Sequence, residues 1–439
     1  MGKNTFTKSI LNKILIIVCI MIVLLLPTFQ IRQLIDNRIE TQDTVAKEIC
    51  SKWGESQTIR GPYLSIPYVQ KGSNQYSSYD GSITVLPNKL DIKGNISPET
   101  RYRGVYEIVV YSSESKISGT FTDMDKLPID RNKYDLLYDK AKFVIGINDL
   151  RGIEKLTDLD WNGQKLVFKP GKGYDESVKS GVIANVALNP AIESISFNTN
   201  LVLKGSKYLY FTPVGSKTDV NISSTWNNPS FNGTFLPDKR EISSNGFTAN
   251  WNILQLNRSF PQVWLNNDHS MNETDFGIDL LIPIDNYLKT HRSIRYSILF
   301  IGFTFLVLFI IEMLYKIYIH PVHYILVGAA LVIFYTLLLS ISEYISFNFS
   351  FALSSLLTIS LIGGYLRTLL KSNKYAILIS MLLIVMYALI FTMIQVQEFA
   401  LIMGSIGLFI ILAIVMYFSN KITWNKQDQS QEHELEQEG

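Results

Sequence analysis

Long stretches without charged residues are the feature that most restricts the fold of this chain. Residues 296–420 form five apolar stretches separated by short polar loops, and a further apolar stretch covers residues 14–31. Crossing the ~30 Å hydrocarbon layer of a bilayer takes about 20 helical residues. Buried helices of soluble proteins rarely stay uncharged for that length. The pattern therefore predicts an integral membrane protein with six spanning helices. The lipid bilayer is then one of its partners.

The region between the first and second apolar stretches is too long to be a loop. It contains short runs rich in β-branched and aromatic residues with a period of two, at 82–86, 105–111, 194–197 and 207–211, which is typical of strands. Asn162-Gly163 is a hairpin signal. We predict a membrane protein in which a β-rich extracytoplasmic domain of antiparallel, sandwich-like sheets is inserted between transmembrane helix 1 and a C-terminal bundle of five transmembrane helices.

The predicted chain has four parts. Residues 1–31 are a cytoplasmic N-terminus and anchor helix, 32–295 a periplasmic β-rich domain, 296–420 the five-helix domain, and 421–439 a Gln- and Glu-rich cytoplasmic tail expected to be disordered. Residues 33–52 are expected to continue the first membrane helix outward. Residues 14–26 also fit the apolar core of a cleaved signal peptide, but no small-x-small site follows, so an uncleaved anchor is expected.

Lysine and arginine residues predict the orientation, because they stay preferentially on the cytoplasmic side in short loops. A cytoplasmic N-terminus puts most of them inside and leaves the short outer loops, 343–346 and 395–398, without any. Lys289, Arg292 and Arg295 argue against this arrangement, but large domains translocate largely regardless of charge. We expect a multi-pass protein of the bacterial inner membrane with both termini cytoplasmic and the large domain periplasmic.

Common catalytic motifs are missing from the sequence. There is no Walker phosphate loop, zinc-protease helix motif, Gly-x-Ser-x-Gly elbow or Cys-x-x-Cys pair. His320 and His323 are close together, but no acidic residue or cysteine stands beside them, so an interfacial loop is expected rather than a metal site. We expect no enzyme, no cofactor and no metal, and the net charge of +2 gives no sign of a nucleic-acid partner.

Five residues are candidates for function. Arg60, in a segment fixed by Gly61, Pro62 and Pro67, suits a carboxylate or phosphate, unless it is paired internally at a turn before the first strand. Trp226 and Phe231 flank an Asn- and Pro-rich segment and would bind a glycan or protein if exposed, but a packed loop between strands is expected. Glu312 and Glu343 are acids in or beside membrane helices, but both fall at helix ends, where water or headgroups would solvate them.

Several strings in this order and spacing resemble the CreD family of bacterial inner-membrane proteins. They are RGPYLSIPY at 60–68, RGVY at 103–106, FTPVG at 211–215, PSFNG at 229–233, LNRSFPQ at 256–262, HPVHY at 320–324, LLLSISE at 337–343 and ALIMGS at 400–405. The resemblance runs from the first helix to about residue 424. It implies an inner-membrane protein linked to cell envelope integrity and to responses to cell-wall antibiotics, and it supplies no catalytic residue.

Two functional hypotheses of different class follow. In the first, the protein is not an enzyme, and its periplasmic domain binds a periplasmic protein or envelope component during envelope stress while the helices anchor it. In the second, it is a small transporter or lipid flippase in which Glu312 and Glu343 line a path. An enzyme acting on wall material is the least supported, because no acid-base pair or activated nucleophile is recognisable.

Overall fold

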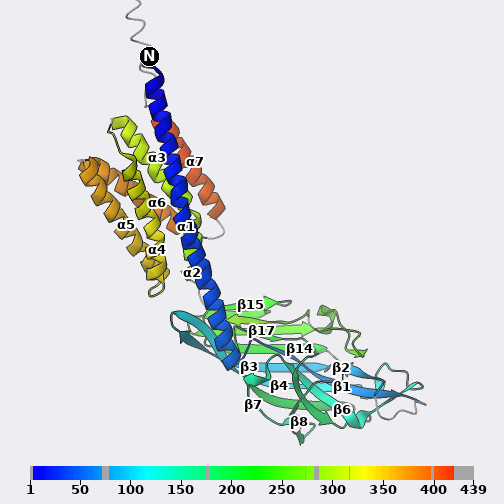
Figure 1. Ribbon diagram of the computed structural model, residues 1–439. Helices are drawn as coiled ribbons and strands as arrows, with labels where there is room; N and C mark the ends of the chain where they lie inside the picture. Colours follow the sequence, from blue (N-terminus) through cyan, green and yellow to red (C-terminus); the bar gives the residue numbers. More distant parts are fainter. Residues whose placement is uncertain are drawn as a thin grey trace, which may run out of the picture. The chain divides into compact units, whose positions relative to one another are not determined.

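The computed structural model describes residues 3–71, 79–174, 178–271, 273–280, 286–315, 317–370, 372–396 and 400–419. The chain divides into two compact units. The helical unit comprises residues 1–42 and 284–439, and the β unit comprises residues 43–283 (Figure 1).

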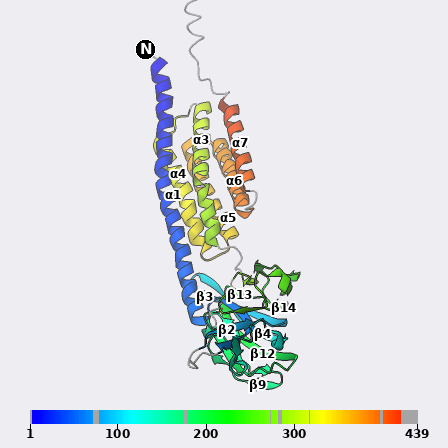
Figure 2. The ribbon, with the colours of Figure 1, turned by 90° about the vertical axis from the view of Figure 1, so that its right-hand side faces the viewer.

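The helical unit is built mainly from long apolar helices that run side by side (Figure 2). Its described helices are α1 (Lys3–Trp53), α2 (Asn286–Arg295), α3 (Ser297–Tyr315), α4 (Pro321–Ser342), α5 (Phe347–Leu370), α6 (Asn373–Gln395) and α7 (Ala400–Ser419). Helix α1 is continuous through Pro27 and ends at Trp53 in the β unit. The predicted helical continuation of the first apolar stretch over residues 33–52 is therefore confirmed.

Five of the described helices are long and apolar enough to cross a membrane: α1, α3, α4, α5 and α6. Helix α7, of 20 residues, lies in the last of the predicted apolar stretches. Large apolar side chains such as Leu15, Phe29, Leu361 and Ile377 are more than half exposed, which suits contact with lipid rather than with water. The predicted membrane protein with a β-rich domain is confirmed.

The β unit contains two sheets. In the described residues the first has ten strands. Seven of them follow one another in the order β10 (Lys169–Pro170), β11 (Gly181–Val186), β6 (Ala141–Ile147), β1 (Gln57–Gln70), β13 (Tyr208–Phe211), β19 (Phe276–Leu280) and β15 (Pro229–Gly233). Strands β2 (Gly81–Val85) and β5 (Tyr134–Leu136) also pair with β1, and β18 (Val263–Leu265) pairs with β2. Strand β19 lies between β13 and β15 and pairs with both.

The second sheet has nine strands within the described ranges. Its order is β16 (Lys239–Ser243), β17 (Gly246–Leu254), β14 (Lys217–Ser224), β3 (Lys89–Arg103), β4 (Tyr106–Thr122), β12 (Ser194–Ser206), β8 (Leu159–Trp161) and β9 (Gln164–Leu166), with β7 (Ile153–Leu156) also on β12. Most pairings are antiparallel, as predicted, but β1 with β13 and β3 with β14 are parallel. The long excursions between these strands let them run in the same direction.

One apolar core joins the two sheets. Phe143 on β6 of the first sheet packs edge-on against Trp161 and Phe197 of the second, and Trp251 contacts Phe276 across the same layer. Strand β14 alternates buried and less buried residues along its length. One face of the second sheet is therefore apolar and buried, and its other face is polar.

The predicted hairpin at Asn162-Gly163 is present between β8 and β9. Both residues have positive φ, 50° and 87°, which is the requirement of the tight turn that matches strand twist.

Candidate functional site

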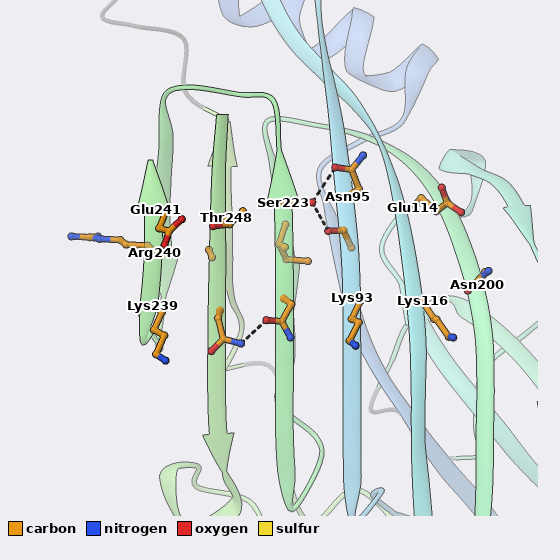
Figure 3. A pocket seen from close by; sticks show the side chains of 15 residues that line it. Lys93, Asn95, Glu114, Lys116, Asn200, Ser223, Lys239, Arg240, Glu241 and Thr248 are labelled. Carbon is orange, nitrogen blue, oxygen red and sulfur yellow. Dashed lines mark hydrogen bonds between the residues drawn. The ribbon is translucent and has the colours of Figure 1, made fainter. Parts of the chain in front are cut away.

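Six polar residues form one row across the outer face of the second sheet. Strand pairing places Lys239 (β16), Asn250 (β17), Asn221 (β14), Lys93 (β3), Lys116 (β4) and Asn200 (β12) directly beside one another in that order. We call this set the lysine–asparagine row. Direct cross-strand partners share a face of the sheet, so the six residues come from distant parts of the chain yet present their side chains together (Figure 3).

The row lies in an open groove of about 650 Å³. A second row of polar residues lines the groove two positions further along the strands: Glu241, Thr248, Ser223, Asn95 and Glu114. Hydrogen bonds hold both rows. In the second row Ser223 Oγ donates to Asn95 Oδ1 at 3.1 Å (Figure 3), and in the lysine–asparagine row Asn250 Nδ2 donates to Asn221 Oδ1 at 2.6 Å. The floor of the groove is thus an ordered layer of amides and hydroxyls.

The lysines of the row have no ion-pair partner among the described residues. Lys93 and Lys116 are direct cross-strand neighbours, an arrangement of like charges that destabilises a sheet. Two acids on the same face are paired with lysines of their own strands, Asp91 with Lys89 on β3 at 3.1 Å and Asp219 with Lys217 on β14 at 3.6 Å. The remaining acids of the lining, Glu114 and Glu241, are outnumbered by its four basic residues, Lys93, Lys116, Lys239 and Arg240. The row is therefore a local excess of positive charge.

Arg60 lies inside β1 at a bulge, where its guanidinium is used within the fold. Its Nη2 donates to Asp275 Oδ2 at 2.6 Å and its Nη1 to Asn148 Oδ1 at 3.0 Å. Thr212 Oγ1 donates to the other carboxylate oxygen of Asp275 at 2.6 Å. The internally paired alternative for Arg60 is confirmed, although the residue is already in the strand rather than in a turn before it.

The aromatic candidates belong to packed structure. Phe231 is 8% exposed on β15 and stacks edge-on with Phe247 and Trp251. Trp226 is half-buried against the core, and its Nε1 donates to Asn228 O at 3.0 Å. The hypothesis of an exposed aromatic surface is contradicted for Phe231. The expected packing is confirmed, although residues 229–233 form a strand rather than a loop.

Glu312 is buried near the end of α3, at 6% exposure. Its carboxylate contacts the Lys13 ammonium from α1 and accepts hydrogen bonds from Tyr324 Oη at 3.0 Å and from Ile319 N at 3.2 Å. Lys13 also donates to Ile319 O at 2.9 Å. The expectation that water or headgroups surround this acid is wrong, because the protein supplies the charge and hydrogen bonds that solvent would otherwise provide.

Glu343 caps the end of α4 and is 12% exposed. Arg38 Nε lies 3.3 Å from its Oε1, and Tyr287 Oη donates to the same oxygen at 3.4 Å. Its expected solvation is likewise replaced by protein partners. Because Lys13 and Arg38 lie about 38 Å apart along α1 at ~1.5 Å per residue, the two acids are at opposite ends of the helical unit.

Both histidines of the pair contact partners within the helical unit. His320 caps α4 by accepting from Val322 N at 3.4 Å, while His323 Nδ1 lies 2.5 Å from Tyr365 Oη. In the part of the chain that the structure describes, no group of three or more His, Cys, Asp and Glu residues is placed to hold a metal ion.

The sequence reasoning missed the lysine–asparagine row. Its members come from six strands, and only the pairing of strands brings them together. Alternating polar residues on β3, β4 and β14 were a signal for an exposed face, but strand order and register cannot be deduced from alternation alone.

Comparison with known proteins agrees with the resemblance found in the sequence. The family described as "Inner membrane protein CreD" matches residues 9–425. The chain is 29% identical over 415 residues to the inner membrane protein CreD of Escherichia coli (strain K12), which covers 92% of this chain and 91% of that protein. An M1 zinc metallopeptidase from Deinococcus radiodurans aligns with 39% of each chain at 11% identity and a TM-score of 0.21, too weak a likeness to support any argument.

Proposed function

Because this chain belongs to the CreD family of inner-membrane proteins, we propose that it supports cell envelope integrity under wall-antibiotic stress by binding an envelope component. The β unit does the binding on the outer side of the membrane, without catalysis, and the helices act as the anchor. The observation that carries this proposal is the lysine–asparagine row, an ordered polar surface with unpaired positive charge.

Charge distribution supports an outward-facing β unit. The N-terminal segment before the first apolar stretch carries Lys3, Lys8 and Lys13, and the loop between α5 and α6 is flanked by Arg367 and Lys374. The short loops at the other ends of the helices carry neither lysine nor arginine. Retention of positive charge on the cytoplasmic side then puts both termini inside and the β unit outside.

The state of the two acids counts against transport. A carboxylate that relays protons or ions must exchange its partners during the cycle, whereas Glu312 and Glu343 are each held by a cation and a tyrosine. Lys13 and Arg38, the partners of the two acids, lie about 38 Å apart along α1. This distance also prevents direct transfer of a proton or ion from one acid to the other.

Complementation of a deletion strain tests the proposal. The gene is deleted in its native host, and sensitivity to β-lactams and detergents is measured with plasmids that carry the wild type or the variants Lys93→Gln/Lys116→Gln and Glu343→Gln. The variants are first shown to be expressed at the wild-type level. We expect Glu343→Gln to rescue and the lysine double variant to fail.

The converse pattern, rescue by the lysine variant and failure of Glu343→Gln, would move the function into the helical unit. A deletion without any phenotype would remove the proposed envelope role altogether.

A further inference from the structure

We propose that the lysine–asparagine row binds an anionic polysaccharide, a chain of sugars that carries carboxylate or phosphate groups, lying across the strands. This inference rests on the proposed function in one respect: it needs the β unit to face the envelope. It adds the chemical class of the ligand.

The lysines provide the charge complementarity. Lys93, Lys116 and Lys239 are exposed, point into the groove and have no ion-pair partner among the described residues (Figure 3). Several surface cations elsewhere in the β unit are paired, for example Lys165 with Asp160 at 2.9 Å and Arg151 with Asp149 at 2.9 Å. An anion in the groove would relieve the repulsion between Lys93 and Lys116 and form charge-assisted hydrogen bonds with both.

The asparagines provide groups for sugar hydroxyls. Each amide offers both donors and an acceptor, which matches a hydroxyl that donates and accepts at once. Asn221 and Asn250 are oriented by their mutual hydrogen bond, so their remaining polar atoms are held in place before a ligand arrives. Fixed donors and acceptors reduce the entropy lost on binding.

The shape of the row suits an extended chain rather than a compact ligand. Six neighbouring strands spaced by about 4.8 Å give a row about 24 Å long. The lysines are unevenly placed, since two strands separate Lys239 from Lys93, while Lys93 and Lys116 are adjacent. A polymer with anionic groups at intervals can reach both positions, whereas a single phosphate or carboxylate can reach only one of them.

Two other anionic partners fit less well. Single-stranded nucleic acid is normally held by aromatic side chains that stack on its bases, and the described lining of the groove includes none. A lipid surface is normally held by apolar side chains inserted between headgroups, and the apolar members of the lining, Ile222 and Ala249, are buried in the sheet.

Binding of defined polymers to the purified full-length protein in detergent tests the inference. Polygalacturonate supplies carboxylates, poly(glycerol phosphate) supplies phosphates, and dextran is the uncharged control. The test variant is Lys93→Gln/Lys116→Gln, and the matched control is Lys133→Gln/Lys172→Gln, which removes two exposed lysines outside the groove. Thermal unfolding followed by circular dichroism checks that both variants are folded.

We expect the wild type to bind at least one anionic polymer more tightly than dextran, with an affinity that falls as ionic strength rises. The test variant should lose about tenfold in affinity, the result of removing two exposed charge contacts, and the control less than about twofold. Equal affinities for the two double variants, or equal binding of dextran, would overturn the inference. So would lysine-dependent binding to phosphatidylglycerol vesicles without binding to either polymer, because that result assigns the row to a lipid surface.

The binding and complementation results separate the two proposals. Lysine-dependent polymer binding together with full rescue by the test variant supports the ligand class and overturns the envelope function through this site. Failed rescue together with unchanged polymer binding supports the function and overturns the ligand class.

Discussion

The ammonium group of Lys13 on α1 contacts the buried carboxylate of Glu312 on α3, with the two side chains 16% and 7% exposed. This ion pair joins the start of the chain to a helix that follows the whole β unit. Tyr324 and the backbone N–H of Ile319 complete the surroundings of the carboxylate.

Removal of the cation alone should destabilise the helical unit. Lys13→Met leaves a buried carboxylate without its charge partner, and we expect a loss of about 3 kcal/mol in the free energy of unfolding. The double variant Lys13→Met/Glu312→Gln removes the charge as well and should recover part of this loss. Thermal unfolding of the purified protein in detergent measures the stability of both single variants, Lys13→Met and Glu312→Gln, and of the double variant. A loss of stability in the double variant equal to the sum of the two single losses would contradict the coupling.

Arg60 should matter for stability and not for ligand binding. Arg60→Ala removes hydrogen bonds to Asp275 and Asn148, and we expect a cost of about 2 kcal/mol because the Asp275 carboxylate loses a charged partner. Asp275→Asn should cost a similar amount, and the double variant less than the sum of the two. Denaturant unfolding provides the comparison, and loss of polymer binding in a folded Arg60→Ala protein would show that this residue does contact ligand.

Phe231 should behave as a core residue. Phe231→Ala removes a ring that packs on Phe247 and Trp251, and we expect a loss of about 3 kcal/mol from burial and cavity terms. The matched control, Leu236→Ala, truncates a side chain that is 65% exposed and should change stability by less than about 0.5 kcal/mol. Equal effects of the two substitutions would mean that this ring is not packed as described.

Glu48 should give the β unit a pH dependence in the acid range. Its hydrogen bond with Arg103, and then that with Lys52, lowers the pKa of the Glu48 carboxyl from 4.5 to about 2. A lowered pKa in the folded state means that the ion pair stabilises fully above pH 4.5 and that this stabilisation is lost as pH falls toward about 2. The unfolding midpoints of wild type and Glu48→Gln should therefore converge over that interval, whereas a constant difference would contradict it.

The membrane helices and several strands could be predicted because their signals are local. A charge-free stretch of about 20 residues indicates a spanning helix wherever it occurs, and Asn162-Gly163 sets its turn through its own backbone preferences. The regular alternation in β12 and β14 likewise follows from one face being buried.

The environment of the candidate residues could not be predicted, because it depends on distant partners. In the sequence Glu312 is an acid at a helix end, and only the folded chain brings Lys13, far away in the sequence, into contact with it. The neighbours Pro229 and Asn232 predict a loop around Phe231, whereas pairing with β19 makes this segment a strand. In the same way, the lysine–asparagine row exists only through the order of six strands.

The position of β19 between β13 and β15 has a consequence for biogenesis. Strand β19 ends at Leu280, shortly before the chain enters the helical unit, so the first sheet cannot be completed until nearly all of residues 43–283 have been synthesised. Until then β13 and β15 present unpaired edges, which are prone to wrong pairing. The strand that joins β13 to β15 is thus the last of the β unit to be synthesised, and holding chaperones would be of most use before it emerges.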